Sequence, residues 1–308
     1  MEILNTRMFK WKKKNPTATG IAKHMDIILL NINVIIYNKP LDLAKTIFIN
    51  MRLESQLVIY FIDNILEILK QPVNIIIAGE DYTFPNNIDV RYKSPDDDRL
   101  QDFRTLGQHK MINKIFVENL DEDIENAIPI PLGLNPKECP TNFDYFLQFE
   151  NIDRNKPLKF TNFNRTRGGG GQWAERGHVK NLCMNNWNDL YVHFGKTDHK
   201  NYLESMGSYL FTICVHGGGL DVNPKLWEAI LIGVIPIIRE NKPYTDIYKK
   251  LDFPVVIVKN WDVDTINENN LTLWYNKYYT YFEDNVRRQQ MLKALSLDYW
   301  INYVNDFE

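Results

Sequence analysis

The sequence has few cysteines, and their arrangement points to no covalent or metal-bound framework. Cys139, Cys183 and Cys214 stand far apart and form no C-x-x-C pair. An odd number at this spacing indicates reduced thiols and excludes a disulfide scaffold or a zinc ribbon as the basis of the fold. Reduced thiols favour a cytoplasmic location.

Long hydrophobic runs and metal-ligand spacings are also missing. The apolar stretch Ile27–Tyr37 is interrupted by two asparagines, so we predict neither a signal peptide nor a membrane span there. The six histidines show no spacing of the H-E-x-x-H kind. Asp262 and Asp264 form a D-x-D motif, but we interpret Asp264 as a helix N-cap. No metal site is therefore predicted.

An excess of charge of one sign is missing as well. The 36 lysines and arginines nearly balance the 39 acids, which gives a net charge of -3. This balance provides no electrostatic argument for binding nucleic acid. The one lysine-rich run, Lys10–Lys14, is predicted to be part of an exposed tail. A surface that attracts a membrane or an acceptor is the alternative.

The apolar content suffices for two domains. The 308 residues, of which 44% are hydrophobic, suit two domains of about 150 residues, with a linker near Glu150–Pro157. Residues 1–25 are polar and are predicted to be a loosely ordered leader. Strand patterns such as Val73–Ala78 then alternate with helix patterns, among which we include Leu41–Asn50. This alternation predicts an α/β fold with mainly parallel sheets.

The stretch Ser208–Arg239 organises the second half of the chain. It contains an apolar run, three glycines, a helical run and a second apolar run, which together predict a β-α-β unit. The predicted strands are Tyr209–Val215 and Val234–Ile238, and the predicted helix is Pro224–Ile232.

The turn of this unit is predicted to bind a phosphate. Gly217, Gly218 and Gly219 let backbone N–H groups approach an anion closely. Asn223 followed by Pro224 predicts a helix start whose positive dipole end faces the same anion. The turn lacks the lysine-serine ending of a P-loop and the third glycine of a dinucleotide fingerprint.

Two side chains near this turn are predicted to contact a nucleotide. Glu228 lies one turn into the helix, where its carboxylate is placed to accept hydrogen bonds from a ribose. His216 ends the preceding strand and is predicted to contact a pyrophosphate. A purely structural residue of the turn is the alternative for His216.

The stretch Phe211–Ile238 resembles the donor-site segment of exostosin-like glycosyltransferases. The shared pattern is a strand, a glycine turn, a helix with a W-E-A core and an I-P-I-I strand. A shorter stretch, Lys114–Leu134, is similar to the end of that family's first domain. Lys225 stands close to where the family often has arginine. The matching residues of the main segment are Phe211, Gly217, Gly219, Leu220, Trp227, Glu228, Ala229, Gly233, Ile235, Pro236 and Ile238.

This resemblance implies two Rossmann-like lobes of the GT-B type that face a central cleft. It implies an acceptor-binding lobe over residues 1–152, a donor lobe over residues 153–285 and a C-terminal helix, residues 286–308, that crosses back to the first lobe. The implied reaction is an inverting transfer of a hexosyl or pentosyl group from a nucleoside diphosphate sugar, UDP-linked, to a glycan or glycoprotein hydroxyl. We expect it to be metal-independent, because basic groups and a helix start stand where a cation would otherwise neutralise the diphosphate. No cofactor besides this co-substrate is implied.

Three features are expected to stabilise the negative charge of the donor diphosphate: Lys225, the helix start at Asn223 and a loop that ends near Arg176. Arg165 and Arg176 are the candidate residues of that loop. Its glycine run, Gly168–Gly171, is interpreted either as a lid that orders over the diphosphate or as a flexible connector.

The general base that takes the proton of the acceptor hydroxyl is expected in the first lobe. Glu80 and Asp81 follow the predicted strand Val73–Ala78 and are the leading candidates, with His109 behind them. Acids that only form a turn are the alternative.

Two other functions stay open. The chain could be a catalytically inactive nucleotide- or glycan-binding protein that keeps the fold, and donor hydrolysis or transfer distinguishes this case. A nicotinamide-dependent enzyme is disfavoured because the third glycine of its fingerprint is missing.

Overall fold

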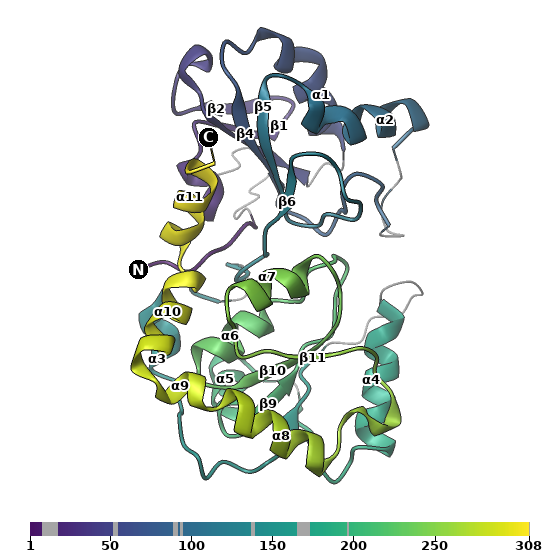
Figure 1. The fold of residues 1–308 in the computed structure, drawn as a ribbon, viewed down its shortest axis with the longest axis vertical. Helices are drawn as coiled ribbons and strands as arrows, with labels where there is room; N and C mark the ends of the chain where they lie inside the picture. Colours follow the sequence, from purple (N-terminus) through teal and green to yellow (C-terminus); the bar gives the residue numbers. More distant parts are fainter. Residues whose placement is uncertain are drawn as a thin grey trace. The chain divides into compact units, whose positions relative to one another are not determined.

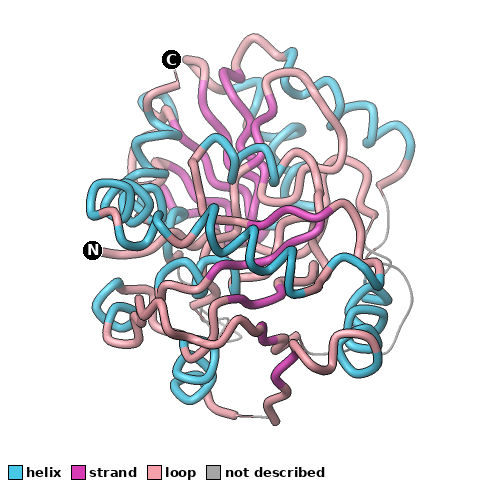
Figure 2. The backbone as a smooth tube through the Cα atoms, turned by 60° about the horizontal axis from the view of Figure 1, so that its bottom comes forward, coloured by secondary structure: helices cyan, strands magenta, loops and turns pink. Residues whose placement is uncertain are grey.

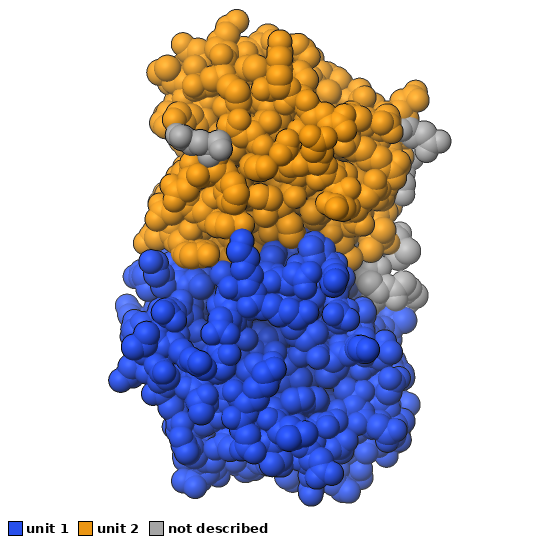
Figure 3. Space-filling view, viewed as in Figure 1, with its two compact units in different colours: residues 1–3, 138–217, 222–296 blue, residues 4–137, 218–221, 297–308 orange. Residues whose placement is uncertain are grey.

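The computed structural model describes residues 1–7, 18–51, 55–88, 92, 95–136, 139–164, 173–195 and 197–307 (Figure 1). The chain forms two compact units, coloured separately in Figure 3. Unit 1 comprises residues 1–3, 138–217 and 222–296, and unit 2 comprises residues 4–137, 218–221 and 297–308. Each unit is built on a sheet, and Figure 2 distinguishes the strands from the helices and loops.

Unit 2 has a six-stranded sheet in the order β2-β1-β3-β4-β5-β6. β2 pairs with β1 as an antiparallel hairpin, and the other neighbours pair in parallel. The residues that follow β3, β4 and β5 therefore lie at the same end of the sheet, the carboxyl end of these strands, which we call its carboxyl edge. The strands are β1 (Ile27–Asn31), β2 (Val34–Tyr37), β3 (Thr46–Asn50), β4 (Val73–Ala78), β5 (Ile112–Val117) and β6 (Ala127–Pro129).

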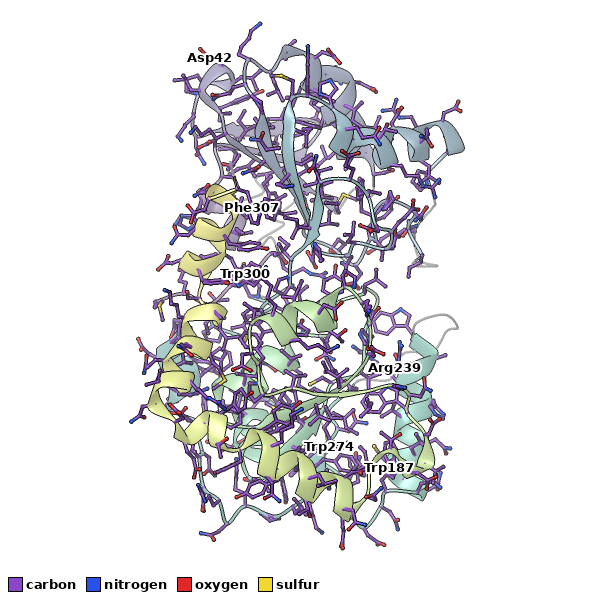
Figure 4. All side chains as sticks on the ribbon, viewed as in Figure 1. Asp42, Trp187, Arg239, Trp274, Trp300 and Phe307 are labelled. Atoms are coloured by element: carbon purple, nitrogen blue, oxygen red, sulfur yellow. The ribbon has the colours of Figure 1, made fainter. Side chains whose placement is uncertain are left out.

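Helices cover both faces of this sheet. One face carries the apolar core that includes Phe61 of α1 and Phe103 of α2. The other face packs against α11: Asn74 of β4 donates a hydrogen bond to the carbonyl of Val304 (2.8 Å), and the rings of Phe116 and Tyr303 lie 6.0 Å apart. Phe307, labelled in Figure 4, follows this helix, and its carbonyl also accepts from Asn74 (2.9 Å). The helices are α1 (Gln56–Asn64), α2 (Asp97–Thr105) and α11 (Leu297–Asn305), with the 3-10 turns η1 (Gly20–His24), η2 (Leu41–Leu43), η4 (Leu66–Ile68) and η5 (Leu106–Gln108).

Unit 1 has a five-stranded, parallel sheet in the order β11-β10-β9-β7-β8. The strand order reverses between β7 and β9, because β8 lies on one side of β7 while β9, β10 and β11 follow on the other. Ligands of parallel sheets bind beyond the carboxyl ends of the strands at such a switch point. The strands are β7 (Phe160–Thr161), β8 (Tyr191–Val192), β9 (Phe211–Ile213), β10 (Ile235–Arg239) and β11 (Val256–Val258).

The helix that follows β9 is the helix of the predicted β-α-β unit, and it is fully buried. Every residue of α6 is buried, and Trp227 packs edge-on against Phe253 with ring centroids 6.2 Å apart. The helices of unit 1 are α3 (Phe143–Leu147), α4 (Ala174–Asn185), α5 (His199–Gly207), α6 (Lys225–Leu231), α7 (Tyr244–Lys250), α8 (Glu268–Tyr278), α9 (Thr280–Glu283) and α10 (Asn285–Leu295), with the 3-10 turn η7 (Val263–Thr265).

The predicted fold class, α/β with two Rossmann-like lobes, is confirmed by these two sheets. Residues 41–50 are not the predicted helix. Thr46–Asn50 is a fully buried run, rich in β-branched and aromatic residues, that pairs in parallel on both sides as β3. No helix in the described part of the chain is long and apolar enough to cross a membrane.

The first residues of the chain differ from the expected loosely ordered leader. Ile3 and Leu4 are fully buried, and the carbonyl of Asn5 accepts a hydrogen bond from the N–H of Ile21 (3.1 Å). Residues 3–6 and 20–22 are thus packed into the units, while the lysine-rich run Lys10–Lys14 lies outside the described residues. Residues 150–157, where a linker was expected, lie within unit 1.

Candidate functional site

The side chains that follow β7 and β9 meet at the switch point of unit 1. Asn164 donates to the carbonyl of Ile213 (3.2 Å) and accepts from the Nδ2 of Asn223 (3.2 Å). Asn223 also donates to the carbonyl of Val215 (2.6 Å), and its Oδ1 accepts from the N–H of Lys225 (3.0 Å). The carboxamide of Asn223 thus ties the start of α6 to the end of β9, and the helix begins one residue later than predicted.

His216 is buried at the end of this strand region. Among the described residues neither of its ring nitrogens has a hydrogen-bond partner, and Nδ1 lies 3.7 Å from Oε2 of Glu175. Glu175 Oε1 accepts from Nε of Arg239 (2.5 Å), which Figure 4 labels, and from Nε1 of Trp261 (2.8 Å). Burial opposes ionisation of Glu175, but His216 and Arg239 outweigh it and lower its pKa to about 2. A buried histidine with two unsatisfied nitrogens is an incomplete polar site.

Arg176 lies on α4 rather than in the predicted loop. Its Nε donates to the carbonyl of His216 (2.8 Å), and its guanidinium lies 4.9 Å from the ring centroid of Trp173. A Cβ atom on Gly217 would lie 3.1 Å from Arg176 Nη2. Glycine at this position therefore leaves room for the guanidinium. Arg165 and the four-glycine run lie outside the described residues.

Lys225, the first residue of α6, is buried with its ammonium group at the end of β9. Its Nζ lies 3.3 Å from the carbonyl of Ile213. Burial, and to a lesser degree Arg176, lowers the pKa of Lys225 to about 8. Arg176, His216 and Lys225 thus place three cationic or protonatable groups at the carboxyl end of one strand, and we name them the basic cluster.

The turn that follows Gly217 belongs to unit 2 from Gly218 onward. Asn119 Oδ1 accepts the N–H of Leu220 (2.8 Å), and Asn119 Nδ2 donates to the carbonyl of Glu80 (2.9 Å). A Cβ atom on Gly219 would lie 2.3 Å from Asn119 Oδ1. This close packing is a reason for glycine at position 219 besides the predicted phosphate contact.

Gly219→Ala should lower the free energy of unfolding by roughly 1–3 kcal/mol, because the added methyl displaces the hydrogen-bonded carboxamide of Asn119. The control is Gly177→Ala, since Gly177 lies within α4 and a Cβ atom there meets nothing within 4 Å. That variant should gain roughly 0.5–1 kcal/mol from helix propensity. Urea unfolding of both variants measures the difference, and equal stabilities would show that Gly219 is not constrained by packing.

Glu228 is buried within unit 1 and engaged by the protein through both carboxylate oxygens. Oε1 lies 3.0 Å from Nε2 of His199, and Oε2 accepts from the hydroxyl of Tyr202 (2.6 Å). Nδ1 of His199 lies 3.0 Å from the hydroxyl of Tyr145. A contact with ribose stays a prediction, and it requires one of these bonds to be shared or exchanged.

Glu80 and Asp81 lie at the carboxyl edge of the unit 2 sheet, where Arg7 joins them. Arg7 Nη2 donates to Asp81 Oδ1 (2.5 Å), Nη1 lies 3.9 Å from Glu80 Oε2, and Nε lies 2.9 Å from Oε1 of Glu118, which follows β5. We name these four residues the acid cluster. Sequence reasoning missed Arg7 and Glu118, although Glu118 is the first charged residue after the buried end of β5.

Glu118 is the buried member of the acid cluster. Its Oε2 accepts the N–H of Gly79 (2.6 Å), and 1% of its surface is exposed. Burial raises the pKa of Glu118 to about 7, although Arg7 and the Gly79 amide favour the ionised form and Asp81 opposes it. This carboxyl group therefore exchanges its proton near neutral pH.

The stability of the protein should fall, relative to the Glu118→Gln variant, as the pH rises from about 4.5 to about 7. In this window Glu118 is ionised in the unfolded chain but protonated in the folded one. The folded state then binds more protons, so a rise in pH favours unfolding. The difference between the two pKa values corresponds to roughly 3 kcal/mol. Urea unfolding of both proteins from pH 4 to pH 8 measures it, and parallel curves would contradict it.

His109 is not brought together with Glu80 and Asp81. It precedes β5, whereas the two acids follow β4, and the two strands are parallel. His109 therefore lies at the opposite edge of the sheet, with Nε2 3.4 Å from Glu67. His109 therefore cannot replace Glu80 or Asp81 as the base at the same site.

The D-x-D motif is part of a turn. Asp262, not Asp264 as predicted, is the N-cap of η7, and it forms a capping box with Thr265. Asn267 is the N-cap of α8. Within the described part of the chain neither aspartate belongs to a group of three potential metal ligands.

No protein-family model and no curated protein match the chain. Among solved structures, sucrose-phosphate synthase from Thermosynechococcus elongatus is 13% identical, with 85% of this chain and 72% of that one covered at a TM-score of 0.46. A glycosyltransferase from Rickettsia africae is 12% identical, with 85% and 76% covered at a TM-score of 0.40. The pneumococcal O-GlcNAc transferase GtfA, in complex with UDP and GlcNAc, is 12% identical, with 97% and 66% covered at a TM-score of 0.37. Scores of this size do not show a shared activity, and the architecture rests on the strands described above.

Proposed function

We propose that the protein is a glycosyltransferase that moves a sugar from a UDP-sugar to a hydroxyl group of a glycan acceptor with inversion of configuration. The observation that carries this proposal is the basic cluster at the switch point of unit 1. His216 is buried with both ring nitrogens unsatisfied among the described residues, and Arg176 and Lys225 flank it. Diphosphate oxygens are acceptors that would satisfy the ring nitrogens of His216 and pair with the two cationic side chains.

The same cluster suits the chemistry of the leaving group. In glycosyl transfer the bond from the sugar to the diphosphate breaks, and negative charge develops on the departing oxygen. Fixed cationic groups in a buried site stabilise that charge without reorganising. We expect this to replace a divalent cation at the diphosphate, so added magnesium or manganese should not raise the rate.

The acid cluster of unit 2 would supply the base. Inversion requires a general base that accepts the proton of the attacking hydroxyl, and a carboxylate can serve as one. Glu80 and Asp81 are the two carboxylates of this cluster that are not fully buried. The resemblance to exostosin-like enzymes and the cytoplasmic location remain expectations from the sequence.

The test compares UDP, UMP, UDP-sugars, other nucleoside diphosphates and NAD in thermal unfolding, followed by assays of donor hydrolysis and transfer. UDP should raise the melting temperature more than UMP, because a ligand of the folded state stabilises it by mass action and UMP lacks the second phosphate. A shift by NAD alone, or by no nucleotide, would contradict the proposal. Binding of UDP-sugars without hydrolysis or transfer to any acceptor would favour the inactive binding protein instead.

A further inference from the structure

Three side chains of the kinds that bind zinc converge in unit 1, away from the D-x-D motif. Cys139 precedes α3, His199 opens α5, and Glu228 lies on α6. One potential ligand atom from each lies within 4.8 Å of the other two, and His199 Nε2 is 3.0 Å from Glu228 Oε1. Three separate elements thus place a thiol, an imidazole and a carboxylate around one point.

The spacing fits a tetrahedral ion. Zinc binds sulfur at about 2.3 Å and nitrogen or oxygen at about 2.0–2.2 Å, which puts neighbouring ligand atoms about 3.3–3.6 Å apart. His199 Nε2 and Glu228 Oε1 lie 3.0 Å apart and all three atoms lie within 4.8 Å of one another, so small rotations of the side chains would bring them to this spacing. A thiolate and an imidazole favour zinc over magnesium or calcium, which prefer oxygen ligands.

The outer contacts of this group are those that metal ligands need. Nδ1 of His199, the ring nitrogen that faces away from Glu228, lies 3.0 Å from the hydroxyl of Tyr145. The second oxygen of Glu228 accepts from the hydroxyl of Tyr202 (2.6 Å). Such outer partners fix the tautomer of a ligating histidine and the orientation of a ligating carboxylate.

Burial gives a reason for a cation at this point. Cys139 and Glu228 are 7% and 6% exposed. A buried carboxylate is costly unless its charge is neutralised, and a divalent ion bound by Glu228 would do this. Among the described residues Cys139 forms no disulfide.

We propose that Cys139, His199 and Glu228 bind a zinc ion that holds α3, α5 and α6 together, with water in the fourth position. This assigns Glu228 to a metal rather than to a ribose. It also differs from the absence of a metal site that the sequence predicts, because the three residues are too far apart in the chain to form a motif. The proposal does not rest on glycosyl transfer.

The test measures metal content and affinity without any sugar nucleotide. The protein purified without chelators should contain one equivalent of zinc, and metal-free protein should bind cobalt with the absorption band of a thiolate ligand. Cys139→Ser and His199→Gln should lower zinc affinity by more than about a hundredfold, since outer partners alone are worth roughly 10- to 100-fold. His193→Gln, at an exposed histidine outside the group, should not.

A second protein keeps the test decisive if Cys139→Ser does not fold. The Cys183→Ser, Cys214→Ser double variant retains Cys139 as its single cysteine, so its cobalt complex must keep the thiolate band. Absence of that band, absence of zinc above background, or loss of zinc in Asp262→Asn would each overturn the proposal. Zinc retained without nucleotide binding would leave the zinc site supported and count against the glycosyltransferase alone.

Discussion

Glu80→Gln should lower turnover about a hundredfold or more while nucleotide affinity stays nearly unchanged. Glu80 lies at the carboxyl edge of the unit 2 sheet, and its side chain is 22% exposed. Its backbone carbonyl accepts a hydrogen bond from Nδ2 of Asn119 (2.9 Å), which fixes the position of the backbone that carries the carboxylate. Arg7 engages Asp81 at 2.5 Å and lies 3.9 Å from Glu80.

Kinetics with separate kcat and KM, together with calorimetry of UDP binding, measure this effect. Asp81→Asn should reduce turnover less than Glu80→Gln, because its main contact is structural. Glu67→Gln is the control, since this side chain is 80% exposed at the opposite edge of the sheet. Near-normal turnover in both Glu80→Gln and Asp81→Asn would remove the base from the acid cluster. Loss of UDP binding in either would mean that these acids hold the donor.

The parts of the fold that the sequence predicts are those whose pattern is local. β4 and β10 are short apolar runs bounded by proline or glycine, and α6 follows the Asn223 and Pro224 signal within one residue. The segment Thr46–Asn50 has no such boundary, although its β-branched and aromatic residues favour a strand. Its pairing with β1 and β4 decides it, and that pairing is not visible in the segment itself.

The site divides in the same way. His216 and Lys225 were found because they stand in one β-α-β unit, where strand and helix place them in order. Arg7 and Glu118 are 111 positions apart and meet only once the unit is folded. A sequence pattern does not record such a contact, and the same holds for Asn119 and Gly219.

A matched pair of buried lysines separates a role in binding from a role in folding. Lys225 lies at the carboxyl end of β9 in the basic cluster. Lys156, also in unit 1, is buried as well, and its Nζ donates to the carbonyls of Asn151 (2.8 Å) and Gly233 (3.2 Å), the latter before β10 and so towards the amino edge of the sheet. Burial lowers the pKa of each lysine to about 8. The two lysines are therefore similarly buried but lie at opposite ends of the unit 1 sheet.

Lys225→Met should weaken UDP binding by roughly 10- to 100-fold, the loss expected for one charged hydrogen bond, without lowering stability at pH 7. Because methionine removes a buried charge, the free energy of unfolding should stay level or rise. Relative to this variant, the stability of the wild type should rise between about pH 8 and pH 10.5, where Lys225 is neutral in the folded state but charged in the unfolded one. Lys156→Met should show the same pH dependence with unchanged UDP affinity. If Lys156→Met weakens UDP binding as much as Lys225→Met does, the loss reflects a general change in unit 1, and the basic cluster is not the diphosphate site.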